Sequence, residues 1–163
     1  MFPQLEAVEG QHPIYGADRL SPDVFQCQGD RDRFRSEPLA VKIEYHATSG
    51  VIGWFGIATP KDTNAEKGYD VDKAGFTKIC FWVYTEQPDQ AFYLRMKDRH
   101  GLERQVEPSI NIKLPDDWRE VCTSLSRFSD MGVDLSQMEN VNLGFTESAG
   151  SATIWVDDFE FRR

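Results

Sequence analysis

Hydrophobic and polar residues alternate along most of the chain beyond its N-terminal part. In the run 39–47 (LAVKIEYHA), Val41, Ile43 and Tyr45 fall on one face and polar residues on the other. This period of two is typical of a half-buried strand, because successive side chains of a strand point to opposite faces. It recurs in six further runs: 51–58 (VIGWFGIA), 76–85 (FTKICFWVYT), 91–98 (AFYLRMKD), 118–125 (WREVCTSL), 139–145 (ENVNLGF) and 151–161 (SATIWVDDFEF).

Turn-forming segments separate these runs, and no long segment has the 3.6-residue period of a helix. Gly, Pro, Asn and Asp gather in TSG, PKDTNAEKG, EQPDQ, DRHG, LPDD and ESAG, as they do in turns. The segment 126–138 has room for one helical turn at most. We therefore expect an all-β fold, a two-sheet antiparallel β-sandwich, with residues 1–163 in a single domain. Residues 1–22 are expected to be an irregular lead-in, followed by a short strand at 23–28.

The charge of the chain excludes some classes of partner. It carries 18 Lys and Arg against 27 Asp and Glu, a formal net charge of −9. Generic binding to nucleic acid or to a membrane surface is not expected, because no basic patch would replace the counterions. No apolar run approaches the roughly 18 residues of a membrane span. The N-terminal residues lack the regions of a signal peptide, so an exported protein would contain this chain as a mature or excised piece.

The cysteines give little information. Cys27, Cys80 and Cys122 are too few and too scattered to predict a disulfide framework or a zinc site. An odd number leaves at least one of them unpaired within the chain. The redox state of the three and the compartment of the protein therefore stay open.

The order of glycine and aromatic positions resembles a known family. The pieces are residues 53–57 (GWFGI), 79–82 (ICFW), 118–125 (WREVCTSL) and 154–159 (IWVDDF). Together they are similar to the β-jelly-roll carbohydrate-binding modules with a galactose-binding-domain-like fold, over about residues 39–161. No single piece is specific, and the ordered set carries the resemblance.

The resemblance implies an eight-stranded jelly roll. One sheet would hold the lead-in strand, the strands at 53–58 and 118–125 and the last strand; the other would hold the strands of Val41, Ile79, Phe92 and Val141. Members of the family are usually non-catalytic modules attached to polysaccharide-degrading enzymes. They bind glycans on a concave sheet face and often carry a structural calcium.

Outward-facing aromatic residues are the first candidates for glycan binding. Sugar rings stack their C–H faces on indole and phenol rings, and their hydroxyls need planar polar partners. Trp54 and Trp155 fall on the polar side of their strands. The resemblance puts these strands in one sheet, so we expect the two indoles to form one exposed stacking platform. The alternative is that loops or the lead-in cover them.

A second candidate cluster is Trp82, Tyr84, Tyr93 and Arg95. We expect Trp82 and Tyr93 on neighbouring strands, where Arg95 could stack on a ring. The alternative is an aromatic cross-strand pair that stabilises the sheet without binding a ligand. Glu120, outward on its strand, is a further candidate ligand-binding residue.

Asp157 and Asp158 are the candidate metal ligands. Adjacent carboxylates on a strand point to opposite faces unless a bulge intervenes, and a bulge could turn one toward a hard cation such as calcium. The family often supplies a second carboxylate from a Phe-Glu pair in the lead-in strand. Here that pair is Phe25-Gln26, and Asp18 or Asp23 could substitute. The alternative is a charged strand end that discourages edge pairing.

No catalytic motif is present. His12, His46 and His100 have no metal-ligand spacing, and neither a nucleophile motif nor a phosphate-binding loop occurs. We therefore expect a non-catalytic module, part of a larger extracellular multidomain protein, that binds a plant or microbial polysaccharide or oligosaccharide and targets an attached glycan-degrading enzyme. The first alternative is a structural or protein-interaction jelly roll without a sugar site. The second is a small glycan-active enzyme, since acid pairs are set by space and not by sequence.

Overall fold

The computed structural model describes residues 25–36, 40–46, 53–58, 70–87, 92–101, 103–106, 117–145 and 151–163. These contain nine strands and very little helix, which confirms the all-β prediction. The strands are β1 (Phe25–Asp30), β2 (Ala40–His46), β3 (Gly53–Ala58), β4 (Lys78–Thr85), β5 (Tyr93–Asp98), β6 (Glu103–Val106), β7 (Arg119–Ser124), β8 (Met138–Phe145) and β9 (Ser151–Arg162). The helical elements are α1 (Ser126–Ser129) and the 3-10 turn η2 (Leu135–Gln137).

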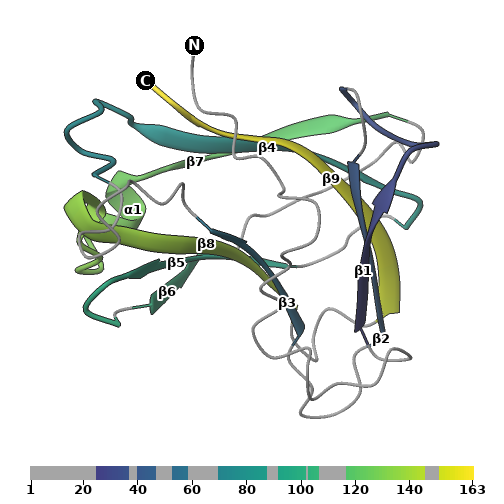
Figure 1. The fold of residues 1–163 in the computed structure, drawn as a ribbon, viewed down its shortest axis with the longest axis horizontal. Coiled ribbons are helices and arrows are strands. Elements are labelled where there is room, and N and C mark those ends of the chain that lie inside the picture. The colour runs from purple at the N-terminus through teal and green to yellow at the C-terminus, as the bar shows by residue number, and fades with distance from the viewer. Residues whose placement is uncertain are drawn as a thin grey trace.

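The strands form two antiparallel sheets that face each other. One has five strands in the order β1-β2-β9-β4-β7, and the other has four in the order β3-β8-β5-β6. In Figure 1, β9 and β8 bend in the same direction, so the four-stranded sheet lies inside the curve of the five-stranded sheet. The outer face of the four-stranded sheet is therefore the concave one. No helix in the described part of the chain is long and apolar enough to cross a membrane.

The expected division of strands between the sheets is partly wrong. β3 pairs with β8 in the four-stranded sheet, whereas β2 and β4 both pair with β9 in the five-stranded sheet. Alternation along a strand fixes which side chains share a face, but carries no information about the neighbouring strand. The short strand β6, which forms a hairpin with β5, was not predicted. The expected lead-in at 1–22 lies outside the described residues.

One apolar core fills the space between the sheets. Its members are the inward residues of the predicted strands, among them Ile43, Phe81, Leu94, Leu143 and Ile154, each fully buried. Phe128 of α1 and Leu135 of η2 are also buried in it. The alternating pattern of the sequence therefore predicts the core correctly.

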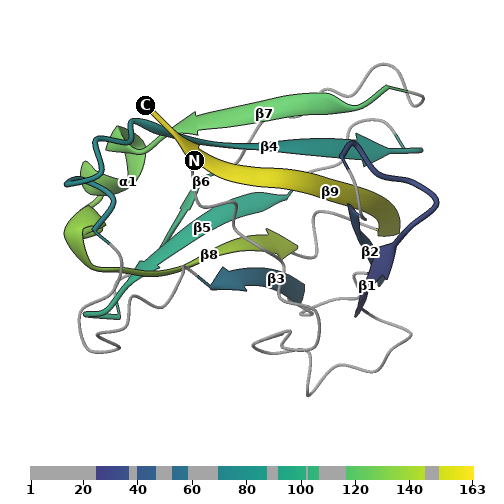
Figure 2. The same ribbon diagram turned by 45° about the horizontal axis from the view of Figure 1, so that its top comes forward.

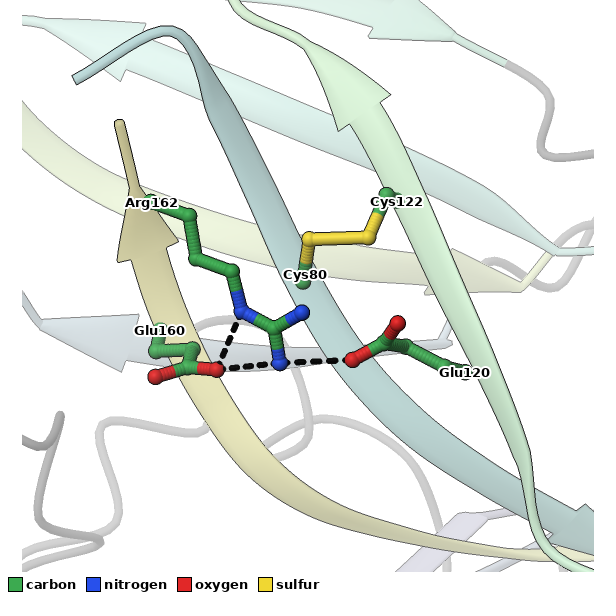
Figure 3. Close-up of a disulfide and its surroundings, with 5 residues drawn as sticks. All are labelled: Cys80, Glu120, Cys122, Glu160 and Arg162. Atoms are coloured by element: carbon green, nitrogen blue, oxygen red, sulfur yellow. Dashed lines mark hydrogen bonds and ion pairs between the residues drawn. A yellow bond between two sulfur atoms is a disulfide. The ribbon is translucent and has the colours of Figure 1, made fainter.

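Cys80 and Cys122 form a disulfide, a pairing that the sequence had left open. They are register partners on β4 and β7, with their Cα atoms 4.1 Å apart although 42 residues separate them in sequence. Strand pairing brings such positions together, and sequence spacing does not reveal it. Figure 3 shows the bond crossing from the interior strand β4 to the edge strand β7, beside Glu120, Glu160 and Arg162.

Reduction of this disulfide should destabilise the domain. Closing a loop of this length restricts the unfolded chain, and the chain-entropy relation gives about 4 kcal/mol as an upper estimate. We expect the double variant Cys80→Ala/Cys122→Ala to lose about 2–4 kcal/mol of unfolding free energy in urea titrations. The Cys27→Ser variant is the control and should remain as sensitive to dithiothreitol as the wild type. Equal stability of the oxidised and reduced wild-type protein would contradict the assignment.

Candidate functional site

The outer face of the five-stranded sheet carries a group of aromatic rings. Tyr84 of β4 and Trp155 of β9 are register partners, and their ring centroids lie 5.4 Å apart, edge to face. The ring of Trp118, just before β7, lies 5.8 Å from that of Tyr84. Trp82 lies two residues before Tyr84 on the same strand and therefore on the same face. These four residues are the outer aromatic cluster.

The chain between β1 and β2 covers this cluster. Figure 2 shows the segment after β1 looping beside β9 and β4, and residues 31–36 of it are called the covering segment here. The guanidinium carbon of Arg33 lies 4.5 Å from the ring centroid of Tyr84 and 4.4 Å from that of Trp155. That of Arg35 lies 4.7 Å from the ring centroid of Trp82. These are cation–π distances, and the rings are shielded by charge instead of by further apolar residues.

Carboxylates hold the covering segment in place from both ends. Asp30 accepts a hydrogen bond from Trp155 Nε1 at 2.7 Å, and its other oxygen accepts from two backbone N–H groups of the segment. Asp157 accepts from the backbone N–H groups of Arg35 and Ser36 at 2.8 and 3.0 Å. Glu86 pairs with Arg33 at 2.6 Å. The segment is thus fastened by groups from β1, β9 and the end of β4.

The expected platform of Trp54 and Trp155 is wrong in two respects. Trp155 faces outward as predicted but is only 6% exposed, because the covering segment lies over it. The strands of Trp54 and Trp155 also belong to different sheets, so the two residues cannot share a face. The side chain of Trp54 lies outside the described part of the structure.

The second predicted cluster is divided between the two sheets. Trp82 and Tyr84 lie on β4 of the five-stranded sheet, whereas Tyr93 and Arg95 lie on β5 of the four-stranded sheet. The expectation that Trp82 and Tyr93 are cross-strand neighbours is therefore wrong. Arg35 stacks on Trp82 in the position that was expected for Arg95.

Glu120 is engaged in an ion pair on the outer face of the five-stranded sheet. Its carboxylate lies 2.5 Å from Arg162 Nη2, and Glu160 contacts the same guanidinium, as Figure 3 shows. The pKa of Arg162 is raised above its usual value, first by the bond to Glu120. These charged groups and the disulfide fasten the last strand, β4 and β7 to one another.

The outer face of the four-stranded sheet has a different character. Tyr93, Arg95 and Lys97 alternate along β5 with buried Leu94 and Met96, so the three polar-tipped side chains face outward, each half-buried. None of them is covered by the covering segment, which lies on the other sheet. Lys97 pairs with Glu139 at 3.4 Å.

The strand register places further residues directly opposite these three on the neighbouring strands. Residues that lie opposite one another across the sheet are called a row. Tyr93 is the partner of Gly144 on β8, which is in turn the partner of Trp54 on β3. Arg95 is flanked by Asn142 on β8 and by Gln105 on β6. Residues directly opposite each other on paired strands belong to one face. These rows therefore combine aromatic, amide and guanidinium residue types. Sequence reasoning missed the amides because it predicted no strand β6 and gave no register between β5 and β8.

A β-bulge in β9 gives Asp157 and Asp158 their setting. Between the pairs Cys80↔Glu160 and Trp82↔Asp157, β9 contains one residue more than β4, and Asp158 has a φ of 50°. The bulge that the calcium hypothesis required is therefore present. Ser36 Oγ donates to Asp158, so both carboxylates bind the covering segment.

The described residues do not supply a calcium-binding set. Calcium needs several oxygen ligands around one point, and in the described part of the chain no three His, Cys, Asp or Glu side chains gather in this way. Asp18 and Asp23, which could substitute for the Glu that Gln26 replaces, lie outside the described residues. Calcium at Asp157 and Asp158 stays a prediction.

Comparison with known proteins identifies the fold. No family model and no curated protein matches the sequence. Among solved structures, a family 30 carbohydrate-binding module is similar with a TM-score of 0.65 and 15% identity, over 84% of this chain and 73% of that chain. A family 11 module of a cellulosomal cellulase of Clostridium thermocellum is similar with a TM-score of 0.58 and 13% identity, over 85% of this chain and 81% of that chain.

Part of a larger enzyme is similar as well. An exo-beta-agarase matches 93% of this chain with a TM-score of 0.62 and 11% identity, and the match spans only 25% of the agarase. The chain thus has the β-sandwich fold of carbohydrate-binding modules, as the sequence resemblance implied. This fold occurs both in separate modules and inside large enzymes.

The Asp30 carboxylate should make the stability of the domain sensitive to acid. The hydrogen bond from Trp155 is the main cause that holds the pKa of Asp30 below its usual 3.8. A lowered pKa stabilises the fold above the unfolded value, and this contribution is lost as the pH falls through the folded value. We expect Asp30→Asn to cost about 1 kcal/mol at neutral pH and to lose less stability than the wild type below pH 3.8. If the melting temperatures of the two proteins fell equally as the pH is lowered, this prediction would be contradicted.

The calcium hypothesis makes its own prediction. An ion bound only by the native state adds RT ln(1 + [L]/Kd), about 2.7 kcal/mol at a hundredfold excess over Kd. The melting temperature in millimolar calcium should then exceed that in chelator, and Asp157→Asn should abolish the difference. Identical melting temperatures in calcium and in chelator would exclude the site.

Proposed function

We propose that the chain is a non-catalytic carbohydrate-binding module whose glycan lies across the concave outer face of the four-stranded sheet. The observation that supports this most is the contrast between the two sheets. The rings on the five-stranded sheet are covered by Arg33 and Arg35, whereas Tyr93 and Arg95 lie outward on the four-stranded sheet, away from that segment.

The residue types on this face suit a sugar chain. A phenol or indole ring offers a flat apolar surface to the C–H face of a pyranose, and Tyr93 and Trp54 occupy one row of the sheet on either side of Gly144. Arg, Asn and Gln supply planar donors and acceptors for hydroxyl groups, and Arg95, Asn142 and Gln105 occupy the next row. Stacking with directional hydrogen bonds is the combination that an uncharged polysaccharide requires.

The similar structures support the same proposal. One family 11 module has been solved in complex with a beta-1,3-1,4-mixed-linked tetrasaccharide, and agarases contain a part with this fold. We infer that the chain serves a secreted glycan-degrading enzyme, to which it is attached as a domain. The disulfide agrees with an oxidising compartment outside the cytosol.

Replacement of Tyr93 tests the proposed face. Tyr93→Ala should weaken binding by about 1–3 kcal/mol, the loss expected for one ring stack. It should change the melting temperature little, because the ring is only half-buried. Isothermal titration with soluble β-1,3-1,4-mixed-linked glucan, cello-oligosaccharides and agarose oligosaccharides measures the affinity.

Trp82→Ala is the matched control. Trp82 is also half-buried, but it lies on the other sheet beneath Arg35. This variant removes the ring on which Arg35 stacks, so it should lose stability, and it should keep its affinity for glycan. Loss of affinity in Trp82→Ala with none in Tyr93→Ala would place the site on the other sheet. Wild-type binding to none of the three glycans would favour the structural alternative, and release of reducing sugar from any of them would favour the enzyme.

A further inference from the structure

The side chain of Arg95 lies over Gly144, one register row away from its own. Gly144 is the direct partner of Tyr93 on β8, and Asn142 is the direct partner of Arg95. A Cβ atom built on Gly144 would lie 3.0 Å from Arg95 Cδ, 3.5 Å from Nε and 3.7 Å from Cγ. The Arg95 side chain therefore leans from its own register position toward Gly144 and would be in tight contact with a Cβ atom there.

The backbone of Gly144 does not explain why a glycine is there. The glycines with positive φ in the described residues are Gly75, Gly101 and Gly132, so Gly144 has a conformation open to any residue. A glycine inside a strand weakens the strand relative to alanine, and it commonly marks a close approach by another group. Here the approaching group is Arg95.

We infer that Gly144 is a positioning residue. Because it has no side chain, it lets the Arg95 guanidinium lie close to the strands on the concave face, in the row of Tyr93. The effect of this positioning on glycan affinity rests on the proposed function. A guanidinium laid beside a stacking ring can donate to the hydroxyls of the sugar on that ring, and its orientation before binding reduces the conformational entropy lost. A Cβ atom at position 144 would press on Arg95 Cδ, and the Arg95 side chain would have to move away from Gly144.

The first measurement needs no ligand. We expect the Nε–Hε NMR signal of Arg95, assigned by its loss in Arg95→Ala, to shift clearly in Gly144→Ala. The melting temperature should stay within a few degrees of the wild type, because alanine suits a strand at least as well as glycine. An unchanged signal in the Gly144→Ala variant would overturn the inference, whether or not the protein binds glycan.

The second measurement is a double-mutant cycle on glycan affinity. With β-1,3-1,4-mixed-linked glucan and with agarose oligosaccharides, Gly144→Ala should weaken binding about tenfold to a hundredfold, the range for a lost hydrogen bond to a charged donor. In the Arg95→Ala background, Gly144→Ala should have no further effect. An equal loss in both backgrounds would show that Gly144 leaves room for the sugar itself, and would overturn the positioning role.

Two controls separate the possible failures. Lys78→Ala removes a cation of β4 on the other sheet, and it should keep its affinity for glycan if the effect of Arg95 is more than net charge. If the wild type binds neither glycan while the Arg95 signal shifts in Gly144→Ala, the proposed function fails and the positioning of Arg95 by Gly144 stands.

Discussion

The position of β9 between β2 and β4 is the constraint on which the other features of the domain depend. β9 is twelve residues long and pairs with β2 through its first half and with β4 along most of its length. It thereby joins β1 and β2 to β4 and β7 in one sheet and leaves β3, β8, β5 and β6 to form the other. Its inward residues Ile154 and Val156 enter the core, while Trp155 meets Tyr84 on the outer face.

The chemistry of the two outer faces follows from this arrangement. Trp155 and Tyr84 are too apolar to lie in water without loss of stability, and Arg33 covers both rings while keeping its own charge paired with Glu86. The bulge at Asp158 turns two carboxylates toward the covering segment and so fastens it. The chain itself thereby covers the aromatic rings on the outer face of the five-stranded sheet.

The strand register determines which residues lie beside one another on the concave face of the four-stranded sheet. Tyr93 and Gly144 are register partners, and the Arg95 side chain lies against Gly144. A shift of β8 by one residue would bring Leu143, which is buried in the core, to the outer face. The same alternation that fills the core therefore also fixes which residues of β8 face outward.

The sequence by itself determined the fold class, most of the strands and the inward residues of the core, because a period of two is a local property that any half-buried strand must have. It also predicted that Trp155 faces outward. Only the tertiary structure decided that Arg33 covers Trp155, that Cys80 meets Cys122 and that Tyr93 and Trp82 lie on opposite sheets. These facts depend on which distant segments become neighbours. Strand pairing and packing of the whole chain set those contacts, and no local pattern of residues records them.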